Sequence, residues 1–266
     1  MKRRAFLQAG VAMAGGAAAW NEPAGQAAHA APSKTTVLVT SAETDLARTL
    51  AAALADPFQV RLTATREVET DLPFTRSDLE PGEATEALVR DVQVVVHVGV
   101  AAPADEEREQ VDRWPRQTYH LLQAAADGGV RRVVYLSSLD LVAGYDPKYL
   151  VDEAWRPQVP IGSGLLPLQL GEFCCREFAR EGRLQVVVLR PGRVVSNNAQ
   201  AENGDDAWVH QRDLAQAVQR AIEAEAPFAG GSLRPWSVFH ILSNVPDSRF
   251  PIQNARRRLG YEPEFP

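Results

Sequence analysis

Two patterns of apolar residues alternate along the chain. The first consists of short, almost wholly apolar runs that are typical of strands buried on both faces of a parallel sheet; they lie at residues 35–40, 59–64, 92–98, 132–137 and 184–190. The second has apolar residues three or four positions apart, as on one face of a helix. It predicts helices after the first run as far as Leu54 and at residues 81–90, 106–127 and about 167–180.

This alternation of strand and helix predicts an α/β fold. Parallel strands that are joined by helices need right-handed crossovers, which place helices on both faces of the sheet. We therefore expect a single-domain, Rossmann-like, doubly wound parallel sheet over residues 35–266. Residues 140–164 carry neither pattern, and a long loop at the carboxyl end of a strand usually shapes a binding site.

The first thirty residues differ from the rest. They begin with a basic segment that contains Arg3-Arg4, continue with an Ala/Gly-rich apolar stretch at residues 9–19, and end in Ala28-His29-Ala30, which offers small residues for signal cleavage. Residues 1–30 resemble a twin-arginine export signal. A general secretory signal with the same basic start is the alternative. The twin-arginine signal predicts a periplasmic or other extracytoplasmic location.

Composition and charge narrow the range of partners. The chain has 266 residues, 45% of them hydrophobic, which is enough for one large core. Its net charge of -6 argues against a nucleic-acid partner, because phosphate binding needs a concentrated positive field. After the signal no segment approaches the roughly 20 apolar residues of a membrane helix. We therefore expect no permanent membrane span.

Histidines and cysteines give no clear site. The five histidines lack the spacing of metal ligands, so we predict no metal site. Cys174 and Cys175 are adjacent, and neighbouring helical residues cannot reach disulfide geometry without distorting the backbone. We expect both to be packing residues. A vicinal redox pair is the alternative.

A series of short motifs carries a resemblance to a known family. In chain order they occupy residues 37–40, 78–79, 91–98, 129–138, 151–153, 187–192, 209–213, 239–244 and 259–263. Their order and spacing resemble the extended short-chain dehydrogenase/reductase superfamily, in particular the NAD-dependent epimerase/dehydratase family and its uronate-dehydrogenase-like branch. The resemblance implies a small C-terminal lobe on the substrate side, NAD or NADP as cofactor, and a sugar or nucleotide-sugar ligand. It leaves a homodimer open.

The turn that holds the cofactor in this family has changed. The family has a GxxGxxG turn after the first strand, and the aligned residues here are Ser41, Thr44 and Ala47. Glu43 and Asp45 add negative charge near the place of the diphosphate, where a carboxylate about 5 Å from a phosphate oxygen costs about 3 kcal/mol. Asp45 also suits a helix cap or first turn. We expect NAD(P) binding to be weak or absent.

Three further residues match family positions along the cofactor cleft. Arg66 follows the second strand, where an arginine favours a 2′-phosphate. Asp78 matches a position near the adenine, and a turn or helix cap is its plain structural interpretation. His97 lies in a strand that lines the cleft in the family, although a single histidine in a strand is commonly a core residue with satisfied hydrogen bonds.

The proton-transfer residues of the family are replaced as well. The family uses a tyrosine whose pKa is lowered by a lysine four residues later. Counting back from the 187–191 motif places Gly164 and Leu168 at these two positions, and no tyrosine of the chain has a lysine at plus four. Ser138 matches the family serine after the fourth strand. Tyr145, in the long loop, is the other candidate acid.

Three classes of function remain open. The first is a catalytically silent or weakly active relative that binds a nucleotide, sugar or protein partner. The second is an active NAD(P)-dependent oxidoreductase or epimerase that acts on a sugar or sugar acid. The third is a structural interaction protein, which would need an exposed apolar patch.

Overall fold

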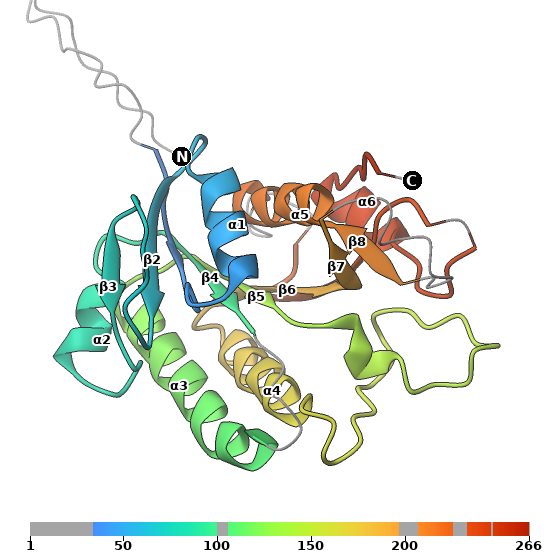
Figure 1. Cartoon of the computed structure of the whole chain (residues 1–266), viewed down its shortest axis with the longest axis horizontal. Helices are drawn as coiled ribbons and strands as arrows, with labels where there is room; N and C mark the ends of the chain where they lie inside the picture. Colours follow the sequence, from blue (N-terminus) through green and yellow to red (C-terminus); the bar gives the residue numbers. More distant parts are fainter. Residues whose placement is uncertain (1–33, 100–105, 197–206, 226–232, 246, 266) are drawn as a thin grey trace, which may run out of the picture. The chain divides into compact units, whose positions relative to one another are not determined.

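Seven parallel strands form the central sheet of the computed structural model (Figure 1), in the order β3-β2-β1-β4-β5-β6-β9. The structure describes residues 34–99, 106–196, 207–225, 233–245 and 247–265, so the predicted signal at residues 1–30 lies outside the described residues. The strands of the sheet are β1 (Thr36–Val39), β2 (Gln59–Ala64), β3 (Phe74–Arg76), β4 (Val94–Val98), β5 (Arg132–Leu136), β6 (Gln185–Pro191) and β9 (Trp236–Ile241). This confirms the predicted parallel α/β sheet.

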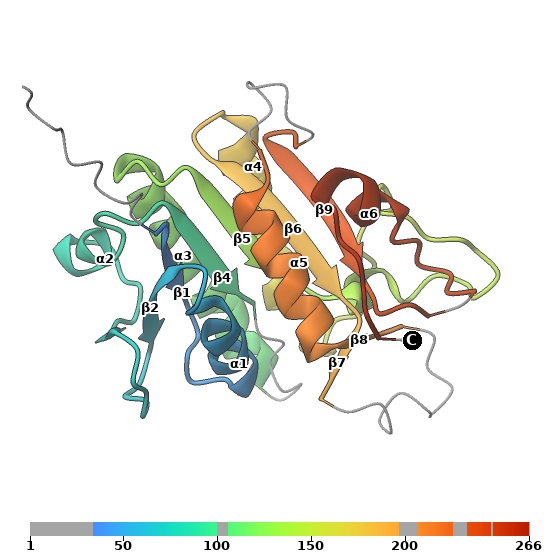
Figure 2. The ribbon, with the colours of Figure 1, turned by 90° about the horizontal axis from the view of Figure 1, so that it is seen from above.

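Helices cover both faces of the sheet (Figures 1 and 2). One face packs against α1 (Asp45–Leu54), α5 (Gln211–Glu223) and α6 (Gln253–Leu259). The other packs against α2 (Glu83–Leu88), α3 (Glu107–Asp127) and α4 (Leu166–Arg180). Successive strand residues point to opposite faces, so each strand contributes to both hydrophobic clusters, as Val186 and Val187 do. The valine-rich runs are therefore fully apolar.

A second, two-stranded sheet consists of β7 (Arg193–Val195) and β8 (Trp208–His210), which pair in parallel. This sheet belongs to the C-terminal half of the sequence, and the small lobe on the substrate side stays a prediction. The strand β9, in contrast, joins the edge of the main sheet next to β6. Among the described residues, no helix combines the length and the apolar character that crossing a membrane requires.

The predicted loop at residues 140–164 is long, as expected. After β5 the chain forms a short 3₁₀ helix, Leu139–Val142, and then runs through turns until α4 begins at Leu166. Its core residues Leu139, Val142 and Val151 pack with Leu242 and Phe250 from the C-terminal part. This small cluster holds the loop over the carboxyl ends of β5, β6 and β9.

Candidate functional site

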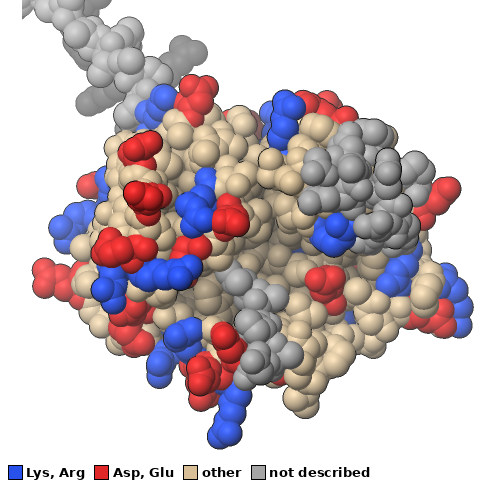
Figure 3. Space-filling view, in the orientation of Figure 1, with Lys and Arg blue, Asp and Glu red and all other residues tan. Residues whose placement is uncertain are grey.

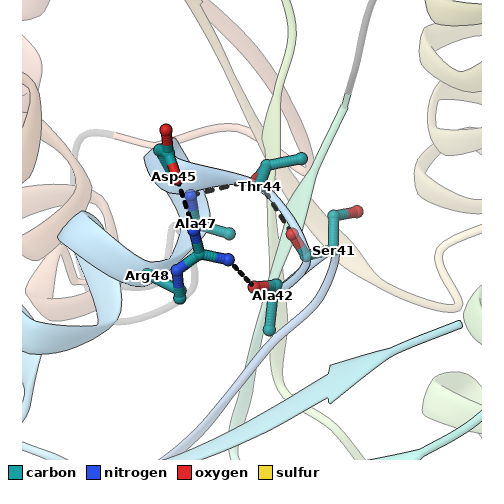
Figure 4. A network of polar contacts seen from close by, with 6 residues as sticks. All are labelled: Ser41, Ala42, Thr44, Asp45, Ala47 and Arg48. Carbon is teal, nitrogen blue, oxygen red and sulfur yellow. Dashed lines mark hydrogen bonds and ion pairs between the residues drawn. The ribbon is translucent and has the colours of Figure 1, made fainter. Parts of the chain in front are cut away.

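The turn between β1 and α1 is built from polar side chains (Figure 4). Ser41 has φ 57°, in the left-handed region that favours glycine, and its hydroxyl donates to the Val98 carbonyl at 2.9 Å. Thr44 is the N-cap of α1: its hydroxyl donates to the Ser41 carbonyl at 2.9 Å and accepts from the Ala47 N–H at 3.2 Å. Ala47 is buried. A backbone N–H that a diphosphate would use is thus occupied by Thr44.

Charged residues surround the same turn. Asp45 lies in the first turn of α1, as one of its two interpretations predicted, and forms an exposed ion pair with Arg48. Arg48 also donates to the Ala42 carbonyl at 3.0 Å. Glu43 is half-buried, and one of its carboxylate oxygens is buried without a hydrogen-bond partner.

Arg66 lies beside the turn at the end of β2. A cavity of about 420 Å³ at this end of the sheet is lined by one apolar side chain, three carboxylates and two guanidinium groups: Val68, Glu43, Glu67, Glu69, Arg48 and Arg66. Three acids facing two bases leave no excess of positive charge for a 2′-phosphate. The structure therefore places Arg66 close to the turn at Ser41–Ala47, among both acidic and basic side chains.

His97 is a buried member of a hydrogen-bonded network. Its Nδ1 lies 2.8 Å from the Thr40 hydroxyl and its Nε2 lies 3.0 Å from the Thr118 hydroxyl, while its ring stacks on Trp114 at 4.8 Å. Burial lowers the pKa of His97 to about 3, so the ring is neutral near pH 7. Both ring nitrogens are already bonded to threonines, which corresponds to the core interpretation of this residue.

Asp78 lies at the surface just beyond β3. Its backbone carbonyl accepts a hydrogen bond from the Gln117 side chain of α3 at 2.8 Å, and its side chain is exposed. The next residue, Leu79, has φ 53° and is buried. The segment thus forms a strained turn that is anchored on α3.

Ser138 and Tyr145 hold local structure in the loop after β5. Ser138 is half-buried and caps the 3₁₀ helix, because its hydroxyl accepts from the Asp140 N–H at 3.1 Å and donates to the Asp140 carboxylate at 3.0 Å. The Tyr145 hydroxyl donates to the Arg156 carbonyl at 2.9 Å, and its ring packs on Trp155. Neighbouring Ser137 is buried and its hydroxyl has no partner.

Gly164 and Leu168 are the residues that the sequence resemblance predicts at the positions of the family tyrosine and lysine. Gly164 has φ 77°, a conformation that disfavours a tyrosine, and its N–H donates to the Glu107 carboxylate at 2.8 Å. The other Glu107 oxygen accepts from the Gly162 N–H at 2.5 Å. Leu168 is 1% exposed and packs against Gly99, where a Cβ would lie 2.2 Å from the leucine Cδ1. Neither glycine nor leucine has a side-chain group that can donate or accept a proton.

A buried tyrosine close to Leu168 is equally unsuited to acid/base chemistry. The Tyr135 hydroxyl donates to the Leu168 carbonyl at 3.1 Å and accepts from the Trp114 indole N–H at 3.2 Å. Burial is the main reason why the pKa of Tyr135 is raised well above its ordinary value. Gly171 makes room for this phenol, since a Cβ there would lie 2.1 Å from the hydroxyl oxygen.

Sequence reasoning placed Glu172 at the family's helix glutamate but did not predict two charged contacts that organise this region, those of Glu107 and of the Glu172–Arg190 pair. Glu107 anchors the entry to α4, as described above. Glu172 forms a buried, bidentate ion pair with Arg190, with distances of 2.9 and 2.8 Å, which ties α4 to β6. Two features of the sequence could have indicated these contacts. Glu107 is an acid in the first turn of α3, and Arg190 is a charged residue at the end of the mostly apolar run at residues 184–190.

The two cysteines are free, and Cys175 is buried while Cys174 is half-buried. Burial raises the pKa of both thiols, so neither is activated as a nucleophile. Within the described ranges there is no cluster of three or more His, Cys, Asp or Glu side chains that could bind a metal ion. On the face drawn in Figure 3, acidic and basic side chains are interspersed rather than gathered by sign.

Comparisons with known proteins identify a family model and several proteins that are similar to this chain. The model of the NAD dependent epimerase/dehydratase family matches residues 37–236. An uncharacterized protein of Bacillus subtilis, YtbQ, is 24% identical over 194 residues, which are 68% of this chain and 72% of that protein.

Two similar proteins have a named activity. An NAD-dependent glucose-6-phosphate dehydrogenase of Haloferax volcanii is 24% identical over 160 residues, 55% of this chain and 58% of that enzyme. The crystal structure of uronate dehydrogenase from Agrobacterium tumefaciens superposes with a TM-score of 0.72 and 20% identity, covering 86% of this chain and 84% of that one. At this identity the superposition shows a common fold.

Proposed function

Because the chain belongs to the NAD-dependent epimerase/dehydratase family, we propose that it keeps the family scaffold without the family's nicotinamide chemistry and acts as a non-catalytic or weakly active binder of a nucleotide, sugar or protein partner. The proposal is carried by Gly164 and Leu168, which stand where the resemblance predicts the family tyrosine and lysine. Leu168 is buried, and the nearest buried phenol, Tyr135, is held by two hydrogen bonds.

The turn after β1 supports the same proposal. NAD needs glycines there so that its diphosphate can approach the first N–H groups of the helix. In this chain Thr44 accepts from the Ala47 N–H, and Glu43 carries a buried carboxylate oxygen that no donor satisfies. These residues do not fit a diphosphate.

Cofactor binding tests this part of the proposal. Calorimetry and thermal unfolding of the purified chain with NAD and NADP should show weak binding or none, whereas a ligand at a hundred times its dissociation constant would add about 2.7 kcal/mol. Replacing Ser41, Thr44 and Ala47 with glycine and Glu43 with glutamine should strengthen binding. Micromolar binding by the unmodified chain would overturn the proposal.

Measurements of catalytic turnover test whether the chain lacks nicotinamide chemistry. General acid/base catalysis is typically worth about 10² to 10⁴ in rate, so uronic acids, aldoses and nucleotide sugars should give no nicotinamide absorbance change. If turnover is seen, Ser138→Ala and Tyr145→Phe identify its source. A loss of activity in folded Tyr145→Phe would make the chain an enzyme with a relocated acid.

An active NAD(P)-dependent oxidoreductase or epimerase on a sugar or sugar acid is the second candidate function. It is favoured by Ser138, which stands half-buried after β5 at the family serine position. Brisk turnover that neither Ser138→Ala nor Tyr145→Phe reduces would show that the helix alignment placing Gly164 and Leu168 is incorrect, and would favour this second candidate.

We further propose that the chain is exported through the twin-arginine route. The support comes from the sequence of residues 1–30, where Arg3-Arg4 precedes a mildly apolar stretch.

A further inference from the structure

A cavity of about 660 Å³ lies beside α4, over the β6–β9 side of the sheet. It is lined by α4, by β6 and the edge strand β9, and by residues 153–157 of the long loop. The volume falls within the range of about 300–1,000 Å³ that is usual for small-molecule sites. None of the residues discussed for cofactor binding or proton transfer lines this cavity.

A charged pair with an unsatisfied donor lies in the wall of the cavity. Glu172 and Arg190 both line it, and their side chains are 6% and 4% exposed. The pair uses Nε and Nη2 of Arg190, while Nη1 is buried and has no hydrogen-bond partner. A buried donor without a partner costs about 1–3 kcal/mol. A ligand oxygen that reaches Nη1 would recover this free energy.

A second polar group lies next to this pair. Glu153 lines the cavity, and one of its carboxylate oxygens accepts from the His240 backbone N–H at 3.4 Å. Burial raises the pKa of Glu153 above its ordinary value. Both ring nitrogens of His240, which pairs with Arg190 across the β6–β9 register, are buried and unpartnered. Glu153 and Arg190 therefore give the cavity wall an acceptor and an unpartnered donor, while His240 is buried and is not one of the lining residues.

Aromatic side chains provide flat apolar walls. Trp155, Trp236 and Phe173 all line the cavity. Trp155 is braced by Tyr145 at 4.5 Å and by Tyr149 at 5.7 Å, so its ring orientation is fixed before any ligand binds. Phe173 carries the guanidinium of Arg176 over its face at 5.1 Å.

The charges in the wall favour a neutral ligand. Arg190 is paired with Glu172, and the exposed Arg176 is paired with Glu177 outside the lining. Glu153 and the solvent-exposed Arg156 then remain, one acid and one base, so the wall has no large excess of either charge. A hydroxyl group can accept from Arg190 Nη1 and donate to Glu153.

We propose that this cavity binds a neutral sugar, with the apolar face of a sugar ring on Trp155 or Trp236 and its hydroxyls on Arg190, Glu153 and Gln169. Neither the turn after β1 nor Ser138 lines this cavity, while the candidate acid Tyr145 contacts its lining residues Trp155 and Arg156 from outside. The proposal therefore stands whether or not the chain binds NAD(P).

The test is calorimetry and tryptophan fluorescence of the purified full chain with maltotriose, cellotriose and chitotriose, and with glucuronate as the anionic probe. At least one trisaccharide should bind and change the fluorescence of the cavity tryptophans. Trp155→Ala should weaken its binding about tenfold, and Trp155→Phe should restore most of the loss because the ring face returns. Tyr119→Ala is the matched control, because this exposed aromatic on α3 lies outside the cavity.

Other outcomes overturn the proposal. If none of the three trisaccharides binds, or if glucuronate alone binds, the neutral sugar class is wrong. Equal binding by wild type, Tyr119→Ala and Trp155→Ala, with all three proteins folded by circular dichroism, would place the sugar elsewhere. Failure of NAD(P) binding, in contrast, bears only on the turn after β1.

Discussion

At the scale of single residues, Ser41 combines a local strain with a compensating contact. Its φ of 57° lies in a region that costs a non-glycine residue about 1–2 kcal/mol, and its hydroxyl bonds the carbonyl of Val98 on β4. The side chain thus links the turn after β1 to the neighbouring strand. A glycine would allow the same backbone without this link.

We predict that Ser41→Ala lowers the free energy of unfolding by about 1 kcal/mol, because the hydrogen bond is lost while the strained backbone stays. Ser41→Gly loses the same bond but relieves the strain, so its stability should lie close to that of the wild type. Urea unfolding of the three proteins measures both values. Equal destabilisation by glycine and alanine would mean that the backbone of Ser41 carries no strain.

His97 makes stability depend on pH. Burial lowers its pKa from 6.5 to about 3, so below about pH 6.5 the unfolded chain binds a proton that the folded chain does not. The free energy of unfolding therefore falls as the pH is lowered from 6.5 toward 3, by up to about 1.4 kcal/mol per pH unit. His97→Gln should reduce this slope, which urea unfolding at a series of pH values measures. An unchanged slope would contradict a neutral, buried His97.

At the scale of elements, the predictable parts are those in which the local pattern and the packing agree. The strand at residues 59–64 has the predicted bounds, and the helices at 106–127 and 167–180 begin within a residue of the prediction. The strands β3, β7 and β8 were not predicted, because strands of three residues are too short to show a period. The strand β9 was recognised only as a family motif, since Ser237 and His240 interrupt its apolar run.

The candidate site was less predictable than the fold. The replacements expected at positions 41, 44, 47, 164 and 168 rest on the resemblance alone. Their contacts do not follow from it, because the roles of Glu107 and Tyr135 depend on residues more than thirty positions away in the chain, such as Gly164 and Leu168. The Glu172–Arg190 pair lies eighteen positions apart and is likewise a product of the packing of α4 on β6.

We predict that Arg190→Ala lowers the free energy of unfolding by about 3–5 kcal/mol, because it leaves the buried Glu172 carboxylate without its partner. Arg183→Ala is the matched control: this arginine pairs with Asp127, but the two side chains are 33% and 59% exposed, so the loss should stay within about 1 kcal/mol. Chemical unfolding of both variants gives the comparison. A similar loss in the two would show that the α4–β6 ion pair contributes no more than a surface pair.

At the scale of the whole molecule, two positions of the expected cofactor and proton-transfer site contribute to the hydrophobic core. Two hydrophobic clusters, one on each face of the sheet, hold the fold together. Of the positions discussed for cofactor binding and proton transfer, Ala47 and Leu168 lie in these clusters as apolar packing residues. Apolar residues at these positions are compatible with the shared fold, and a shared fold does not by itself establish a shared activity.

The cellular location of the folded molecule depends on which export route its signal uses. The twin-arginine route depends on its arginine pair, whereas a general secretory signal depends on positive charge alone. Arg3→Lys combined with Arg4→Lys keeps the charge of the segment and removes the pair, so we expect the variant to stay in the cytoplasm while the wild type is exported. Fractionation of cells that express each form measures this, and Lys2→Arg serves as the control because it leaves the pair intact. Normal export of the double variant would replace the twin-arginine route by the general secretory one.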